Sequence, residues 1–209
     1  MRMVSNLAHP PTAMLYPEIR KLTYRELLAM EQAGIIGEDE HLELLGGQIY
    51  KTTINPAHAM AVSALAQRFS VAFDGRAQVI PQNPLRLSDD LNDTELPQPD
   101  VMLVKSQLYL DHPRPASVHV LVEVSDSTLT KDKTLKLPLY AHVLIAEVWI
   151  VNLIERRFEV YTNPQDGAYQ DCAMYDLTAT FAPTAFPETT RQWLTADLLT
   201  LLDQQQASS

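Results

Sequence analysis

Cysteine and glycine are scarce in this 209-residue chain, and both shortages exclude classes of site. The one cysteine, Cys172, excludes an internal disulfide and argues against a zinc site built on thiolates. Of the six glycines only Gly46 and Gly47 are adjacent, and no phosphate-binding loop or dinucleotide fingerprint is present. The chain also lacks a Gly-x-Ser-x-Gly elbow, which argues against a serine hydrolase.

Long apolar runs are absent as well. No run approaches the roughly 18 residues that a membrane-spanning helix needs, and residues 1–20 hold several prolines and no apolar signal-peptide region. With a single cysteine, these features predict a cytoplasmic protein that does not contact a membrane.

Positive charge is the third shortage. The chain has 16 Lys and Arg against 26 Asp and Glu, a net charge of −10. This balance argues against broad nonspecific binding to nucleic acid, which depends on a positive surface. It does not exclude nucleic acid as a substrate, because metal ions and a local basic patch can offset the repulsion.

Apolar residues are plentiful, at 46% of the chain, which is enough to fill a sizeable core. We expect residues 1–20 to be extended or disordered, residues 21–203 to form one domain, and residues 204–209 to be a flexible tail. A capping box at Thr23 predicts a helix to about Ala33, and Gly46-Gly47 predicts a β-hairpin. A second helix should open at Asn55-Pro56, with Met60 or Ala61, Leu65, Phe69 and Ala72 toward the core.

Most of the remaining segments are predicted to form strands. The segments with strand-like patterns are 77–81, 84–87, 100–104, 118–124, 146–153, 156–162 and 169–177. Residues 131–142 and 195–202 have helical patterns, and Pro138 should either kink the first of these helices or make it start near Lys136. The order predicts a mixed α/β (α+β) domain with one central mixed sheet flanked by helices.

Two acids stand on neighbouring apolar strands: Asp100 begins one, and Glu123 lies inside the next. A buried carboxylate is costly unless it is paired or binds a cation, and two converging carboxylates favour a divalent metal. Mg²⁺ (or Mn²⁺) suits such a pair, and a nearby lysine would then complete a site for phosphodiester hydrolysis. The alternatives are that Asp100 only starts a strand after a turn, and that Glu123 forms a structural ion pair.

The motifs "LELLGGQIY", "QPDVMLV", "LVEVSDSTLTKDKTLKLPLYA" and "EVWIVNLIERRFEVY" occur in order, with Pro56 and His58 opening the helix between the first two. In this arrangement the chain resembles the Uma-type restriction endonuclease family of the PD-(D/E)XK nuclease superfamily over residues 22–202. The resemblance implies a restriction endonuclease-like core in residues 21–203, a Mg²⁺-dependent endonuclease with DNA as substrate, and a homodimer.

Carried onto this sequence, the resemblance makes Asp100 the first acid and Glu123 the second, both metal ligands. Ser125 occupies the place of the superfamily's lysine, and Lys136 on the following helix would substitute for it. Glu43 matches a further acidic position that could supply another metal ligand. The resemblance also suggests that His58, Gln98 and Ser125 contact and orient these residues without binding the metal themselves.

Each assignment has a simpler alternative. Lys136 could pair with Asp132 on a helix surface, four residues away. Glu43 could point to water, and His58 could only cap or pack. Lys131 and Lys133 are expected to be solvated. A function of another class also fits the acidic charge and the missing lysine at position 125: a nuclease-fold binding or regulatory module with little or no catalytic activity.

Overall fold

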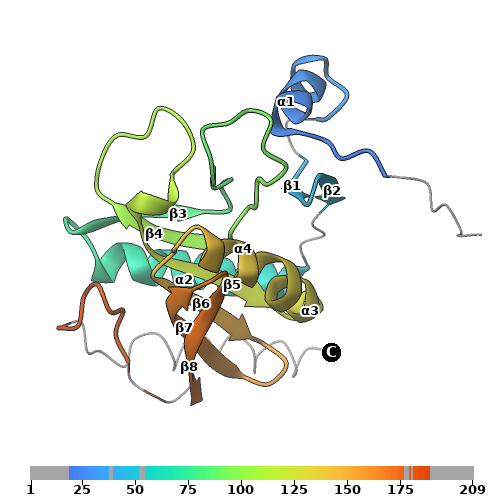
Figure 1. Cartoon of the computed structure of the whole chain (residues 1–209). Coiled ribbons are helices and arrows are strands. Elements are labelled where there is room, and N and C mark those ends of the chain that lie inside the picture. The colour runs from blue at the N-terminus through green and yellow to red at the C-terminus, as the bar shows by residue number, and fades with distance from the viewer. Residues whose placement is uncertain (1–18, 38–39, 52–54, 177–178, 180, 189–209) are drawn as a thin grey trace, which may run out of the picture.

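The computed structural model describes residues 19–37, 40–51, 55–176, 179 and 181–188, and its centre is a six-stranded mixed sheet (Figure 1). Its strands, in order across the sheet, are β3 (Ala77–Pro81), β4 (Val101–Lys105), β5 (Val118–Ser125), β6 (Glu147–Asn152), β7 (Arg157–Gln165) and β8 (Ala168–Asp176). Only β5 and β6 run parallel; the other neighbours are antiparallel. The predicted helix at 195–202 and most of the predicted N-terminal segment lie outside the described residues.

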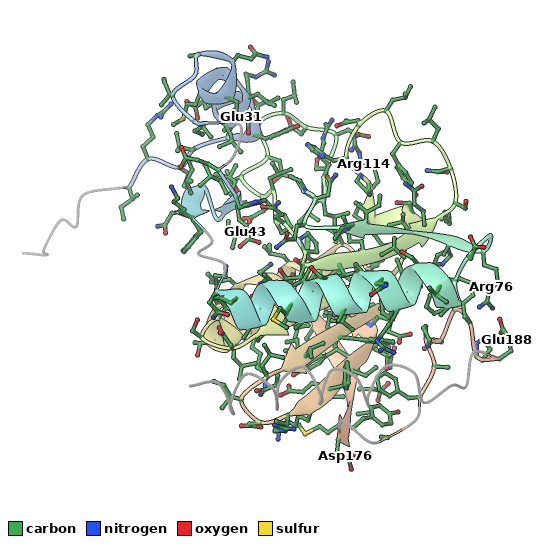
Figure 2. All side chains as sticks on the ribbon, turned by 180° about the vertical axis from the view of Figure 1, so that it is seen from behind. Glu31, Glu43, Arg76, Arg114, Asp176 and Glu188 are labelled. Carbon is green, nitrogen blue, oxygen red and sulfur yellow. The ribbon has the colours of Figure 1, made fainter. Side chains whose placement is uncertain are left out.

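Helix α2 (Pro56–Ala72) covers one face of the sheet and lies in front of it in Figure 2. The Asn55 side chain accepts a hydrogen bond from the His58 backbone N–H, which caps the helix, and Pro56 takes its first position. Of the two predicted core positions at this turn, Ala61 is buried, whereas Met60 is 40% exposed. The buried core on this side is formed by α2 and the alternate strand residues that face it.

A second helical segment covers the other face. It consists of the single turn α3 (Leu129–Lys131), a π-helical turn η2 (Asp132–Lys136) and α4 (Leu137–His142). Pro138 explains the wide turn: it has no N–H to donate to Thr134, and its ring crowds that carbonyl in an α-helix. Instead, the Leu137 N–H bonds to the Asp132 carbonyl five residues back.

The N-terminal elements form a small layer beside the sheet (Figure 1). Helix α1 (Tyr24–Gln32) starts with the predicted capping box, and Gly34 follows its end with a positive φ of 67°. The hairpin β1 (Leu42–Leu45) and β2 (Gln48–Lys51) turns at the two glycines, both with positive φ. A bridge between Leu44 and Leu96 ties the hairpin to the loop that leads into β4.

One expected strand is absent. Residues 84–87 form no strand, because the Leu85 and Arg86 N–H groups bond to the separate carbonyls of Pro97 and Pro113 rather than to a neighbouring strand. In the sheet, β6 and β7 are interior strands, and β3 and β8 stand at the edges. In the part of the chain that is described, no helix has the length and apolar character to cross a bilayer.

Candidate active site

The two acids of the predicted pair lie side by side in the sheet. Val101 of β4 pairs with Val122 of β5 in antiparallel register, which places Asp100 opposite Glu123. A hydrogen bond fixes this arrangement: the Val124 N–H donates to Asp100 Oδ2 at 2.8 Å. The strand register, which the sequence pattern does not contain, therefore brings the two carboxylates together.

Lys136 lies between Glu123 and a third acid, Glu43. Its Nζ is 2.8 Å from Glu43 Oε1, 2.8 Å from Glu123 Oε1 and 3.4 Å from the Gln98 carbonyl. An ammonium group has three N–H donors, so these acceptors use all of them. The alternative of a surface pair with Asp132 is wrong, because both residues are buried and Asp132 Oδ2 accepts the Ser125 and Thr128 hydroxyls, each at 2.7 Å.

Glu43 is buried, with 1% of its side chain exposed, so the alternative that it points to water is excluded. Its Oε1 also accepts the Gln98 N–H at 3.0 Å, and its Oε2 is 2.7 Å from Lys131 Nζ. Burial alone would raise the pKa of Glu43, but the two lysines outweigh it and lower the pKa to about 2. Glu43 is therefore a permanent anion that holds both lysines. Figure 2 shows it where the hairpin meets the sheet.

The expectation that Lys131 and Lys133 are solvated holds only in part, because 22% and 32% of their side chains are exposed but each ammonium pairs with a buried acid. Lys131 pairs with Glu43, and Lys133 Nζ lies 2.7 Å from Glu159 Oε2. Glu159 is fully buried on β7, two strands across the sheet from Glu123, and also accepts hydrogen bonds from Arg157 and Tyr161. Only Lys131 therefore joins Lys136 at the site.

His58 supports Asp100. Its Nε2 lies 3.1 Å from Asp100 Oδ2. Burial would lower the pKa of His58, but the Asp100 carboxylate outweighs burial and raises it, which favours the imidazolium and a donated hydrogen bond. The α2 cap brings the ring to this place, because Asn55 starts the helix three residues earlier.

Glu123 has a different environment. Tyr140 donates its hydroxyl to Glu123 Oε1 at 2.6 Å, in addition to the Lys136 contact. Complete burial raises the pKa of Glu123 well above its ordinary value; Lys136 opposes the rise, and Asp100 and other nearby acids add to it. The pKa of Glu123 is therefore shifted in the opposite direction from that of Glu43, and additional positive charge would stabilise the Glu123 anion.

The acid pair fits a divalent cation. Asp100 Oδ1 and Glu123 Oε2 accept no hydrogen bond from any described residue, whereas both oxygens of Glu43 and of Glu159 do. Among the described residues no group of three or more His, Cys, Asp or Glu side chains is arranged to hold a metal. Mg²⁺ takes one or two carboxylates and keeps several waters, so two free carboxylate oxygens suit it.

Three residues of the site escaped sequence reasoning: Lys131, Asp132 and Tyr140. The last two recur with Lys136 at intervals of four, a spacing that places Asp132, Lys136 and Tyr140 on one helical face. That signal was present in the sequence. Nothing in the sequence pattern indicated Lys131, because its position depends on the π-helical turn.

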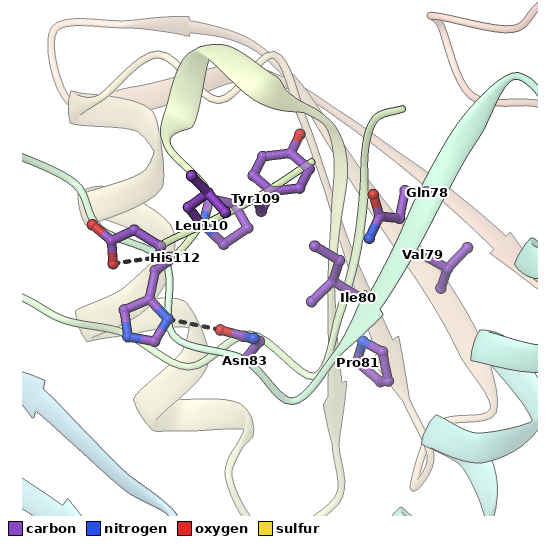
Figure 3. A pocket seen from close by; sticks show the side chains of 10 residues that line it. Gln78, Val79, Ile80, Pro81, Asn83, Tyr109, Leu110 and His112 are labelled. Carbon is purple, nitrogen blue, oxygen red and sulfur yellow. Dashed lines mark hydrogen bonds between the residues drawn. The ribbon is translucent and has the colours of Figure 1, made fainter. Parts of the chain in front are cut away.

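A separate cavity of about 670 Å³ opens beside the edge strand β3 (Figure 3). Its lining comes from β3 and the loop at 109–113, and His112 Nδ1 lies 2.9 Å from Asn83 Oδ1 across it. None of the acids or lysines of the site lines this cavity. The chemistry of the acid pair is therefore not located in it.

Comparisons with known proteins identify the fold and the family. A crystal structure from Anabaena variabilis, described as a "putative nuclease belonging to DUF820", has the same fold, with a TM-score of 0.63 and 14% identity over 87% of this chain and 99% of that one. No curated protein matches the sequence. The model of the Uma2 family, described as "Putative restriction endonuclease", matches residues 24–197. The match covers most of the chain and supports a nuclease function, and the chain therefore belongs to the Uma2 restriction endonuclease family.

Proposed function

We propose that the protein is a Mg²⁺- or Mn²⁺-dependent endonuclease that hydrolyses phosphodiester bonds in DNA. The observation that carries the proposal is the pairing of Asp100 with Glu123 across β4 and β5, each with one carboxylate oxygen free, beside the buried Lys136. The family match supports the nuclease class. The metal, the DNA substrate and the residue roles are our inference from the site.

In this proposal Asp100 and Glu123 hold the metal, which, when bound, supplies Lewis-acid stabilisation to the phosphate. The protein's own part is to fix these groups beforehand. His58 and the Val124 N–H hold Asp100 by Oδ2, and Tyr140 and Lys136 hold Glu123 by Oε1. The remaining oxygen of each carboxylate is left for the cation.

Lys136 supplies positive charge where the phosphate gains negative charge during the reaction. Water adds its hydroxyl to phosphorus, one P–O ester bond breaks, and the water's proton goes to the departing oxygen. Burial lowers the pKa of Lys136, but Glu123, Glu43 and the other nearby acids outweigh burial and raise it, so the ammonium stays charged at neutral pH. Ser125 acts through Asp132, which it binds, and so helps to fix the turn that carries Lys136.

Cleavage of both strands of a duplex would use two copies of this site, and we include a homodimer in the proposal. The edge strands β3 and β8 are the places where sheets of two copies could join. Light scattering after size exclusion checks this directly, and a strictly monomeric protein that cuts both strands would refute it.

The test is cleavage of supercoiled plasmid, linear duplex and RNA of the same sequence in Mg²⁺, Mn²⁺ or EDTA. Glu123→Gln keeps the shape of the side chain, and we expect it to lower the cleavage rate on the order of 100-fold or more. Glu159→Gln is the matched control, because it removes a buried acid on the same sheet that does not touch the site. It should cut like the wild type.

The alternative is a nuclease-fold binding module with little or no catalytic activity. The absence of a lysine at position 125 favours this binding module. The residue there is Ser125, whose hydroxyl donates to Asp132. A folded wild type that binds metal and cuts none of the substrates would favour this module and refute the enzyme. Cleavage of RNA alone would keep the residues and replace the substrate.

A further inference from the structure

Lys131 and Lys136, which both bind Glu43, differ in how many of their ammonium N–H groups have hydrogen-bond acceptors. All three N–H groups of Lys136 have acceptors, and its side chain is 3% exposed. Lys131 has a single acceptor among the described residues, Glu43 Oε2 at 2.7 Å, and is 22% exposed. Two of its donors therefore have no protein partner in this part of the chain. Lys131 is the lysine with donors to offer an incoming ligand.

The π-helical turn is what places both lysines at one carboxylate. Residues five apart in an α-helix point about 140° away from one another. The i→i+5 bonding of η2 brings such residues onto the same side, so that Lys131 and Lys136 bind the two oxygens of Glu43. The widened turn exists because of Pro138, and π-turns of this kind are frequent at functional sites.

Lys131 is the most exposed of the described cations at the site, with 22% of its side chain exposed, against 9% for His58 and 3% for Lys136. The Asp100 side chain is 13% exposed, whereas Glu43 and Glu123 are almost fully enclosed. A phosphate that comes to these exposed groups finds more acids than cations around it. A phosphate entering there meets Lys131 before any other described cation at the site, because Lys136 is enclosed and His58 faces Asp100.

We propose that Lys131 is a substrate-binding residue of the site: its ammonium exchanges Glu43 Oε2 for a non-bridging oxygen of a DNA backbone phosphate. Glu43 keeps Lys136 and the Gln98 N–H when Lys131 leaves, so the exchange strands no buried charge. Lysine's long stem allows the movement. This inference rests on the proposed function, since it names how that same site holds its substrate.

The experiment compares Lys131→Met with Lys133→Met. Both lysines lie within three residues on the same helical segment, and in each case the carboxylate left behind keeps another cation, Lys136 for Glu43 and Arg157 for Glu159. Binding of a fluorescent 20-base-pair duplex is measured by anisotropy in EDTA between about 50 and 200 mM salt, where loss of phosphate contacts is visible.

Loss of one phosphate contact reduces the slope of log K against log salt by about 0.9 for duplex DNA. We expect Lys131→Met to show this reduction and roughly tenfold weaker binding, and Lys133→Met and Lys131→Arg to keep the wild-type slope. Equal slopes for Lys131→Met and Lys133→Met, with wild type binding and cutting DNA, would overturn the inference and leave the proposed function intact. A wild type that neither binds nor cuts DNA would overturn both.

Repeating the comparison in the Glu43→Gln background distinguishes phosphate binding by Lys131 from a purely structural role. If Lys131 only neutralises Glu43, Lys131→Met has no effect on the slope once Glu43 is uncharged, and the inference fails. If Lys131 contacts phosphate, the same reduction of about 0.9 persists in this background. Urea unfolding of each variant identifies any that is not folded, and Lys131→Gln then replaces Lys131→Met in the same comparison.

Discussion

Lys136→Met tests the arrangement of charges on which the site depends. Lys136 Nζ bridges Glu43 and Glu123 at 2.8 Å to each, and it is almost completely buried. Methionine fills a similar volume, so the substitution removes the charge without leaving a large cavity. The variant keeps the buried carboxylates of Glu43 and Glu123 but lacks the cation between them.

The expected cost follows from what each carboxylate keeps. Removing one partner of a buried ion pair costs about 3–5 kcal/mol of the free energy of unfolding. Glu43 keeps Lys131 and the Gln98 N–H, and Glu123 keeps only the Tyr140 hydroxyl. The loss is therefore concentrated on Glu123, and we expect about 3 kcal/mol, at the lower end of the range.

A double-mutant cycle identifies the cause. In the double variant that combines Glu123→Gln with Lys136→Met, residue 123 is neutral, so the loss of the Lys136 ammonium leaves no unpaired charge there. We expect the double variant to be about 2 kcal/mol more stable than the sum of the two single losses predicts. The assay is urea unfolding at pH 7 in EDTA, with m-values compared across the four proteins.

Two results would refute this reasoning. One is a cost below about 1 kcal/mol for Lys136→Met, the value of an exposed ion pair. The other is strict additivity in the cycle, which would mean that Lys136 and Glu123 do not interact.

The remaining predictions concern Tyr140, Glu159 and Pro138. Tyr140→Phe removes a buried donor to Glu123, so it should cost about 1–3 kcal/mol in urea unfolding and lower the cleavage rate; a variant as stable as wild type would contradict this. Burial raises the pKa of Glu159, but Lys133, Tyr161 and Arg157 outweigh it and lower the pKa to about 2 in the folded chain. The unfolded value is about 4.3, so the stabilisation is complete above that pH and is lost as the pH falls toward 2. The difference in stability between wild type and Glu159→Gln should therefore shrink over this interval, and a difference independent of pH would be evidence against the pairing. Pro138→Ala restores an N–H that can bond to Thr134, so the π-turn should relax toward α-helix. Lys131 should then turn away from Glu43, and DNA binding should weaken; unchanged binding would show that the proline does not set the turn.

Local chemistry made much of the fold predictable. The Thr23 capping box, the Gly46-Gly47 turn and the Asn55-Pro56 helix start depend only on neighbouring residues, and all three occur where expected. The segment at 84–87 was mistaken for a strand because its apolar side chains alternate. Leu85 is indeed fully buried, but its backbone bonds to a loop, which no periodicity reveals.

The site residues were predictable from the sequence only in part. Carboxylates on neighbouring apolar strands identified Asp100 and Glu123, and the resemblance supplied Lys136 and Glu43; the structure brings these residues together. The position of Lys131 was not predictable from helical periodicity, because a single proline changes the number of residues per turn. Its ion pair with a residue 88 positions earlier exists only in the folded chain.

The most direct test of the central claim, that Asp100 and Glu123 hold a divalent cation, is calorimetric titration of the protein with Mn²⁺. The account predicts saturable binding by wild type, loss of that binding in Asp100→Asn and Glu123→Gln, and retention in Glu147→Gln. Glu147 is a buried acid on β6 whose two oxygens already accept from Trp149 and Thr184. Equal Mn²⁺ binding by wild type and Glu123→Gln, or no binding by folded wild type, would contradict the account.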